Sequence, residues 1–324
     1  MTTLRYCKNL ASFFIGMACA LLYGCSSTTV EPLISFHSIQ QYDDGTEIIA
    51  VTTHLNNDSI VFGQSRLRES IFKYVGRNGD SLQLRLWYPP EGQYDPQQLM
   101  LFIPGYGASS LTMFPMGLAS TRRNIVTGIV TLRGSGLNAR HNPTFGLQEH
   151  EDVVDAIRAL QRTMQPRLKV AIFGVSLGGV VAVNAAAEDS HAEDPHIVGI
   201  ALEGLPWDLQ QAASRALSGR ELAIVEYVLQ GREAFVDSLS PKRSIPRLNA
   251  AIPLLAQWGG KDEVVTTEDQ KLLREALIKV NPTITIHSID SAGHTMRLGW
   301  PLPQQQAVAI NEEIITTLQQ ALSK

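Results

Sequence analysis

The stretch FGVSLGG, from Phe173 to Gly179, is the part of the sequence that most constrains the fold. It ends an apolar run typical of a buried strand, KVAIFG (169–174), and leads into LGGVVAVNAAA, which favours a helix. Gly174 and Gly178, two residues either side of Ser176, allow close backbone approach between the strand and the helix. A turn of this kind lifts a serine hydroxyl towards the positive end of the helix, so Ser176 is a candidate nucleophile. The alternative is an ordinary connection made of small residues.

From Leu99 onward, strand-like and helix-like segments alternate along the chain. Nearly continuous apolar strands between helices indicate an α/β fold with a mostly parallel central sheet, covered on both faces by helices. Catalytic side chains in such a sheet are expected at the carboxyl ends of the strands. The expected strands are residues 99–104, 125–131, 169–174, 196–204, 252–259 and 283–290, and the expected helices are about 148–164, 177–188, 268–280 and 304–322.

Two further segments complete the expected domain. From Leu33 to Pro89 the pattern is strand-like, with an Asn78-Gly79 hairpin signal followed by an alternation of Leu82, Leu84 and Leu86 with polar neighbours, which predicts antiparallel strands. Residues 205 to about 248 are too long for a simple connection and look helical. We expect them to form a small helical cap over the substrate site; the alternative is a set of crossover helices that do not contact substrate.

A nucleophilic serine needs a base that removes its proton. His294, in DSAGHTM, falls just after the last predicted strand, at the expected edge of the sheet. The other histidines precede the sheet, flank a helix start, lie within a strand or occupy a polar loop. They are His37, His54, His141, His150, His287, His191 and His196, of which the last two lie near Glu193 and Asp194 in an alternative metal cluster. We expect no metal site.

The histidine in turn needs a carboxylate that sets its tautomer and stabilises its charged form. Asp262, in AQWGGKDEVV, follows the penultimate strand and is the preferred candidate. Glu203, at the end of the strand GIALEG, is an alternative, because a carboxylate there could also reach the histidine. Asp290 is nearer to His294 in sequence but is expected to cap the end of a strand.

The order serine, acid, histidine is the order found in α/β-hydrolases, and residues 99–324 resemble a serine hydrolase of that family, with esterase-like character. FIPGYGAS resembles the family's oxyanion loop, TLRGSG (131–136) its turn after the fourth strand, and EHEDVVDAIRAL its helix before the nucleophile strand. The resemblance implies that the backbone N–H groups of Tyr106 and Leu177 bind the oxyanion. Tyr106, Arg133 and Trp207 either line the substrate pocket or have structural roles.

The family resemblance also implies an activity. We expect Ser176, Asp262 and His294 to cleave carboxylic esters through an acyl-enzyme intermediate, with no cofactor and with a small-molecule or lipid ester as substrate. Because the fold hosts many reactions, two alternatives remain. One is an acyltransferase or serine peptidase that acts on envelope lipids or peptides. The other is an envelope binding protein without catalytic activity.

The first residues are expected to form a cleaved export signal. Arg5 and Lys8 precede an apolar run, residues 10–24, that is shorter than the roughly 20 residues needed to span a bilayer. LLYGCSS resembles the lipobox of bacterial lipoproteins, with Cys25 as the lipidated residue. This implies a signal peptide (1–24), a tether (25–32) and a hydrolase domain (33–324). We expect the protein to be held in the bacterial cell envelope by its lipid, at the outer membrane and facing the periplasm. The alternative is an ordinary signal peptide with an incidental cysteine.

Composition limits the remaining possibilities. The 324 residues suit one large domain or two small ones. A net charge of −4 without a basic run gives no sign of nucleic-acid binding. No cysteine follows Cys25, so the exported domain has no internal disulfide and depends on its core for stability.

Overall fold

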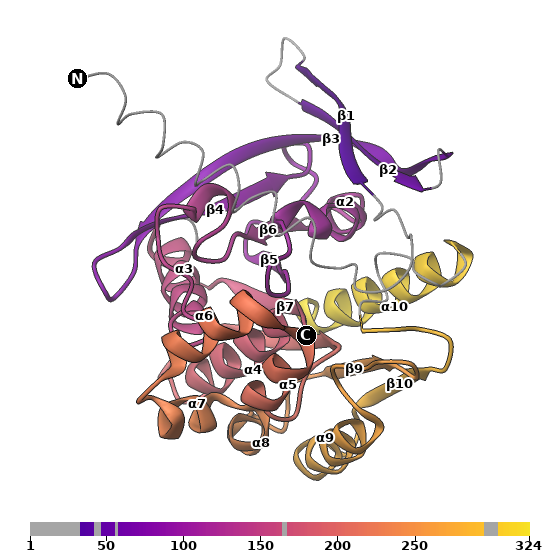
Figure 1. Ribbon diagram of the computed structural model, residues 1–324. Coiled ribbons are helices and arrows are strands. Elements are labelled where there is room, and N and C mark those ends of the chain that lie inside the picture. The colour runs from indigo at the N-terminus through magenta and orange to yellow at the C-terminus, as the bar shows by residue number, and fades with distance from the viewer. Residues whose placement is uncertain (1–32, 42–46, 56–57, 164–166, 295–303) are drawn as a thin grey trace, which may run out of the picture.

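The computed structural model describes residues 33–41, 47–55, 58–163, 167–294 and 304–324 (Figure 1). The expected signal peptide, Cys25 and the tether lie outside the described residues. Within the described ranges, no helix has both the length and the apolar character that crossing a membrane requires.

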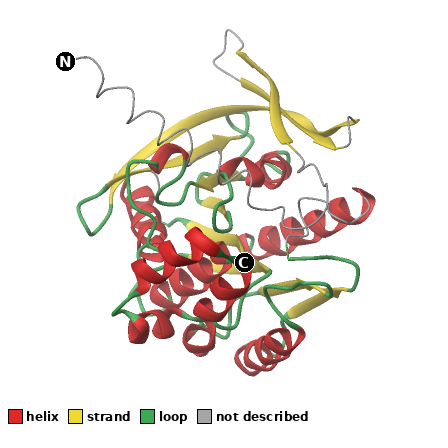
Figure 2. Cartoon of the chain, viewed as in Figure 1, coloured by secondary structure: helices red, strands yellow, loops and turns green. Residues whose placement is uncertain are grey.

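The ten strands of the described chain form one sheet in the order β1-β2-β3-β4-β6-β5-β7-β8-β9-β10. Pairing is antiparallel from β1 to β6 and parallel from β6 to β10. The mostly parallel sheet with N-terminal antiparallel strands is therefore confirmed (Figure 2). The strands are Leu33–Gln41 (β1), Glu47–Leu55 (β2), Asp58–Val75 (β3), Ser81–Tyr88 (β4), Gln98–Ile103 (β5), Val126–Val130 (β6), Lys169–Val175 (β7), Ile197–Glu203 (β8), Leu254–Gly259 (β9) and Thr285–Ile289 (β10).

The long strand β3 joins the N-terminal hairpin to the rest of the sheet. Its first half pairs with β2 and its second half with β4. The chain then reverses at the predicted turn, where the Gly76 N–H donates to the Asp80 carbonyl at 2.9 Å and Gly79 has a φ of +81°. Glycine adopts this left-handed conformation without steric cost, which explains why the Asn78-Gly79 signal predicted the hairpin correctly.

Helices cover both faces of the sheet, as predicted. On one face, α3 (Glu149–Thr163) and α4 (Leu177–Asp189) pack over a core that includes Val154, Ile157 and Val181. On the other face, α2 (Phe114–Thr121) and α10 (Gln304–Leu322) pack over Phe102 and Phe173. The helix α9 (Thr267–Val280) follows β9.

The helix α2 was not among the predicted helices. It is short, contains Pro115 and Gly117, and has little difference between its faces, so it lacks the amphipathic pattern that reveals a helix. A Cβ on Gly117 would lie 3.0 Å from side-chain atoms of both Trp87 and Ile129. Tertiary packing against β4 and β6 therefore favours the glycine and the helix together.

Residues 205–248, the expected cap, form helices between β8 and β9. Figure 1 shows these helices together beside α4. The cap is bound to the body of the protein: the Asn184 side chain donates to the Leu239 carbonyl at 2.8 Å, and the Trp258 Nε1–H donates to the Leu205 carbonyl at 3.0 Å. Its elements are α5 (Leu209–Ala216), α6 (Gly219–Leu229), α7 (Glu233–Leu239), α8 (Pro241–Ser244) and the 3₁₀ helix η3 (Ile245–Arg247).

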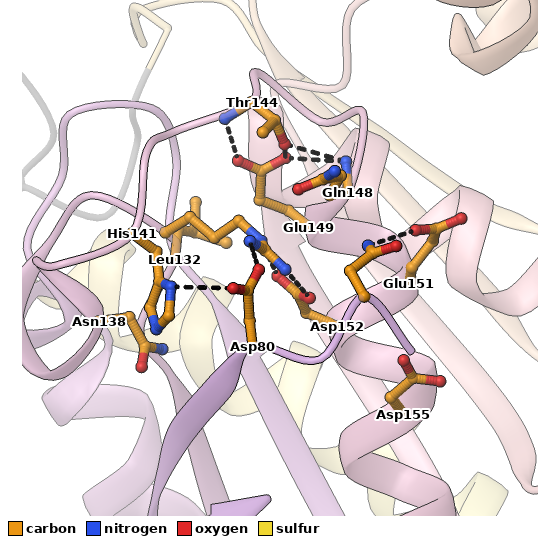
Figure 3. A network of polar contacts seen from close by, with 12 residues as sticks. Asp80, Leu132, Asn138, His141, Thr144, Gln148, Glu149, Glu151, Asp152 and Asp155 are labelled. Atoms are coloured by element: carbon orange, nitrogen blue, oxygen red, sulfur yellow. Dashed lines mark hydrogen bonds and ion pairs between the residues drawn. The ribbon is translucent and has the colours of Figure 1, made fainter. Parts of the chain in front are cut away.

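Arg133 connects the β3–β4 hairpin to α3. Its guanidinium is buried and bonds both oxygens of Asp152 at 2.6 and 2.7 Å, and its Nη1 lies 2.5 Å from Asp80 Oδ2. Figure 3 shows Asp80 and Asp152 close together in this network. The hydrogen bond from Arg133 lowers the pKa of Asp80. Of the two roles considered for Arg133, the contacts support the structural one.

Candidate active site

Ser176 occupies a strained turn between β7 and α4. Its φ of 51° and ψ of −118° lie in a region that non-glycine residues rarely adopt. The turn is held in place because the Ser176 N–H donates to the Glu203 carbonyl at 2.8 Å, while the Ser176 carbonyl accepts from the first turn of α4. Strain of this kind, kept by the surrounding structure, is typical of a functional position.

The two glycines around Ser176 are required by space. A Cβ on Gly174 would lie 2.3 Å from the Gly178 carbonyl oxygen, and a Cβ on Gly178 would lie 2.3 Å from the Ile103 carbonyl oxygen. Neither distance is possible for a real side chain, and the atoms encountered are backbone atoms that cannot move aside easily. The glycine spacing around the serine therefore has a steric cause.

The structure brings Ser176, Asp262 and His294 into one hydrogen-bonded chain. His294 Nε2 lies 2.8 Å from Ser176 Oγ, and His294 Nδ1 lies 2.8 Å from Asp262 Oδ2. The three residues follow β7, β9 and β10, which are parallel to one another and so end at the same edge of the sheet. In this arrangement the histidine can accept the serine proton while the carboxylate holds its other nitrogen.

The three candidate carboxylates have different surroundings. The Asp262 side chain is fully buried, and its Oδ1 accepts from the N–H groups of Val264 and Val265 at 2.9 and 2.8 Å, which leaves Oδ2 directed at His294. Glu203 is also buried, but its Oε2 accepts from Gln257 Nε2 at 2.8 Å. Asp290 is exposed. The histidine contact is thus made by Asp262.

Gly204 packs against His294, and the sequence did not identify it as a site residue. Its φ is +59°, and a Cβ there would lie 2.9 Å from the His294 carbonyl oxygen and 3.2 Å from His294 Cε1. The residue therefore permits the histidine loop to pack against the end of β8. Its only signal in the sequence is a glycine directly after a predicted strand, which is common and does not reveal a neighbour ninety residues away.

Tyr106 and Leu177, the expected oxyanion residues, both adjoin the serine. A Cβ on Gly105 would lie 3.4 Å from Ser176 Cβ, so the loop that continues to Tyr106 passes directly beside the nucleophile. The Tyr106 ring packs against Phe145, with 4.5 Å between the ring centroids. Leu177 is the first residue of α4, where a backbone N–H has no partner within its own helix and lies at the positive end of the helix dipole.

The remaining candidates have structural contacts. His287 Nε2 lies 2.8 Å from Glu313 of α10, and His196 Nδ1 lies 3.1 Å from the Leu168 carbonyl oxygen. Trp207 packs against the core on the side of the cap, where its carbonyl accepts from the Lys242 N–H at 3.2 Å. In the described part of the chain, no three histidine, cysteine or acidic side chains are grouped so that they could bind a metal ion.

A strained serine turn in hydrogen-bond contact with a histidine, at the carboxyl edge of a mostly parallel sheet, is typical of α/β-hydrolases. The family model described as the alpha/beta hydrolase family matches residues 100–311. The chain belongs to this family. A search of curated proteins finds no match.

Solved structures with the same fold include esterases and a peptidase. An esterase of Pyrococcus furiosus has a TM-score of 0.57 and 17% identity, covering 78% of this chain and 93% of that one. A carboxyl esterase of Bacillus coagulans has a TM-score of 0.59 and 13% identity, covering 78% of this chain and 99% of that one. A puromycin-hydrolyzing peptidase of Mycobacterium tuberculosis has a TM-score of 0.61 and 18% identity over 86% of this chain and 46% of that one. At these identities the likeness shows the fold alone.

Proposed function

We propose that the protein is a serine hydrolase that cleaves carboxylic esters through an acyl-enzyme intermediate. The observation that carries this proposal is the hydrogen-bonded chain from Ser176 through His294 to Asp262, with 2.8 Å at each contact. The strained turn at Ser176 and the similarity in fold to esterases support it.

The first half of the proposed reaction forms the acyl-enzyme. Ser176 Oγ attacks the ester carbonyl carbon while His294 Nε2 takes the hydroxyl proton, and Asp262 stabilises the resulting imidazolium through Nδ1–H. The negative charge on the former carbonyl oxygen is bound by the N–H groups of Tyr106 and Leu177, whose directions are set before the reaction begins. The tetrahedral intermediate then collapses, the bond to the leaving alcohol breaks, and His294 gives its proton to the alcohol oxygen.

The second half releases the acid. A water molecule takes the place of the alcohol, His294 removes one of its protons, and the oxygen attacks the acyl carbon. Collapse of this second intermediate breaks the bond to Ser176 Oγ, which recovers its proton from His294. The proposed sequence of steps involves no metal or organic cofactor, and its substrate is a small-molecule or lipid ester.

The similarity to a puromycin-hydrolyzing peptidase favours amide cleavage as the second candidate function. The test compares esters and amides that carry the same acyl group, over a series of acyl-chain lengths, with and without an added alcohol acceptor. We expect the ester to be hydrolysed faster than the matched amide, and free acid to exceed the transesterified product. Faster cleavage of the amide would favour a peptidase, and dominant transfer to the alcohol an acyltransferase. An absence of covalent labelling by a fluorophosphonate would favour a non-catalytic binding protein.

We also propose that the protein is exported and held in the cell envelope by lipid on Cys25, on the basis of the sequence LLYGCSS. In cells grown with labelled palmitate, the protein is expected to carry the label and the Cys25→Ser variant to lose it. Labelling that survives this substitution would rule out Cys25 as the lipidated residue.

A further inference from the structure

The cap helix α5 contacts the loop that carries Asp262. Arg215, in the last turn of α5, donates from Nη1 to the Val264 carbonyl at 3.1 Å and forms an ion pair with Asp269. Its Nη2 donates to Gln211 Oε1 at 3.1 Å, one turn earlier in the same helix. One cap side chain therefore bridges to the segment between β9 and α9.

The carbonyl that Arg215 contacts belongs to the peptide unit that joins Val264 and Val265. The N–H of this same unit, on Val265, donates to Asp262 Oδ1 at 2.8 Å. Because a peptide unit is planar, the direction of its carbonyl fixes the direction of its N–H. A guanidinium on the carbonyl oxygen also polarises the unit and strengthens the bond that its N–H donates. Arg215 and Asp262 thus act on opposite sides of one rigid group.

The ion pair with Asp269 anchors this bridge. Asp269 is buried at the start of α9, where its Oδ2 also accepts from the N–H and the hydroxyl of Thr266 at 3.2 and 3.1 Å. On the other side of the loop, the Lys261 N–H donates to the Ala292 carbonyl at 2.9 Å. A backbone hydrogen bond to Ala292 therefore fixes the loop next to the histidine segment, and Arg215 fixes it next to α5.

We propose that Arg215 is a positioning residue for the active site. It fixes the Val264–Val265 peptide unit, through it the Asp262 carboxylate, and so couples the cap to the hydrogen bond on His294. This inference rests on the proposed function, in which Asp262 and His294 have catalytic roles. A substrate that shifts α5 would thereby alter the orientation of the carboxylate and the activation of the serine.

The first test replaces Arg215 with methionine, which keeps a long apolar stem but removes the charge and the donors. We expect kcat for a short-chain ester to fall about tenfold with KM little changed, because hydrogen bonds to charged groups are among the stronger ones and only part of this effect reaches the chemistry. Arg215→Lys, which keeps the charge for Asp269, should recover part of the loss. The matched control is Arg243→Met, since the ion pair of Arg243 with Asp237 lies within the cap, and its kcat should be unchanged.

A double-mutant cycle separates positioning from a merely structural effect. If Arg215 acts through the carboxylate, Arg215→Met should cost less than about twofold in kcat once Asp262→Asn is already present, because coupled residues are not additive. A full tenfold loss in that background would overturn the proposal. Thermal unfolding of each variant identifies any loss that comes from a smaller folded fraction.

An NMR measurement tests the positioning role of Arg215 without any measurement of ester hydrolysis. The proton between His294 Nδ1 and Asp262 should give a far-downfield NMR signal that disappears in Asp262→Asn. We expect this signal to move upfield or broaden in Arg215→Met and to stay in place in Arg243→Met. Such a change in a protein without esterase activity would reject the proposed function but retain the positioning role. An active enzyme in which Arg215→Met changes neither signal nor rate would reject the positioning role alone.

Discussion

Replacing Ser176 with alanine is expected to lower kcat for ester hydrolysis by about 10⁴- to 10⁶-fold, as removal of a serine nucleophile does in enzymes of this mechanism. The remaining activity would come from the oxyanion donors and from substrate binding, which do not require the hydroxyl. Covalent labelling by a fluorophosphonate should disappear in the same variant, since the probe reacts with the activated serine. Initial rates and labelling of the purified protein measure both effects.

The control for this experiment is Ser190, at the far end of the helix α4 that begins directly after Ser176. Ser190 follows the last residue of α4, and its hydroxyl donates to the Ala187 carbonyl at 2.9 Å. Ser190→Ala therefore removes a similar hydroxyl at the end of α4 opposite to Ser176. Its kcat and labelling should match those of the unmodified protein. Ser176→Ala should also keep the thermal unfolding midpoint, because only an oxygen atom is removed. Activity within tenfold of the unmodified protein would mean that the nucleophile is another residue.

Asp262→Asn is expected to have the second largest effect, a loss of about 10⁴-fold in kcat. The N–H groups of Val264 and Val265 both point at the position of Oδ1, so the asparagine oxygen will occupy that position and its NH₂ group will face His294. His294 Nδ1 must then accept a hydrogen bond, and its proton moves to Nε2. A histidine in that tautomer cannot take the proton of Ser176 Oγ. Kinetics at saturating ester measure the loss.

Glu203→Gln is the matched control, since it makes the same chemical change in the other buried carboxylate of the sheet edge. The amide oxygen of the new glutamine can accept the same hydrogen bond from Gln257. We therefore expect kcat to change by less than about tenfold, which corresponds to the free energy of one neutral hydrogen bond. A larger loss for Glu203→Gln than for Asp262→Asn would assign the carboxylate role to Glu203.

The local pattern of the chain predicted most of the fold. Apolar runs between helical segments predicted the parallel strands, and the Asn78-Gly79 turn predicted the hairpin, because both depend on residues close in sequence. The helix α2 escaped prediction, since its proline, its glycine and its uniform apolar character carry no periodic signal. Its formation depends on packing against Trp87 and Ile129.

Sequence patterns did not decide which carboxylate contacts His294. Asp262, Glu203 and Asp290 all follow strands, and spacing along the chain ranked them without deciding. The decision depends on which oxygen atoms other groups occupy: two backbone N–H groups orient Asp262 towards His294, and Gln257 binds Glu203. Arg133 is a similar case, because its two carboxylate partners lie 19 and 53 residues away.

The sequence by itself determined the parallel strands, most of the helices that cover them and a turn at Ser176, because the hydrophobic pattern of a strand or helix depends on residues close in sequence. The tertiary structure decided that His294 contacts Ser176, which of the candidate carboxylates contacts His294, and that an arginine of α5 contacts the loop that carries Asp262. Those contacts depend on strand order and on the paths of separate loops to one edge of the sheet. No local pattern records them, since each partner is more than thirty residues from the next.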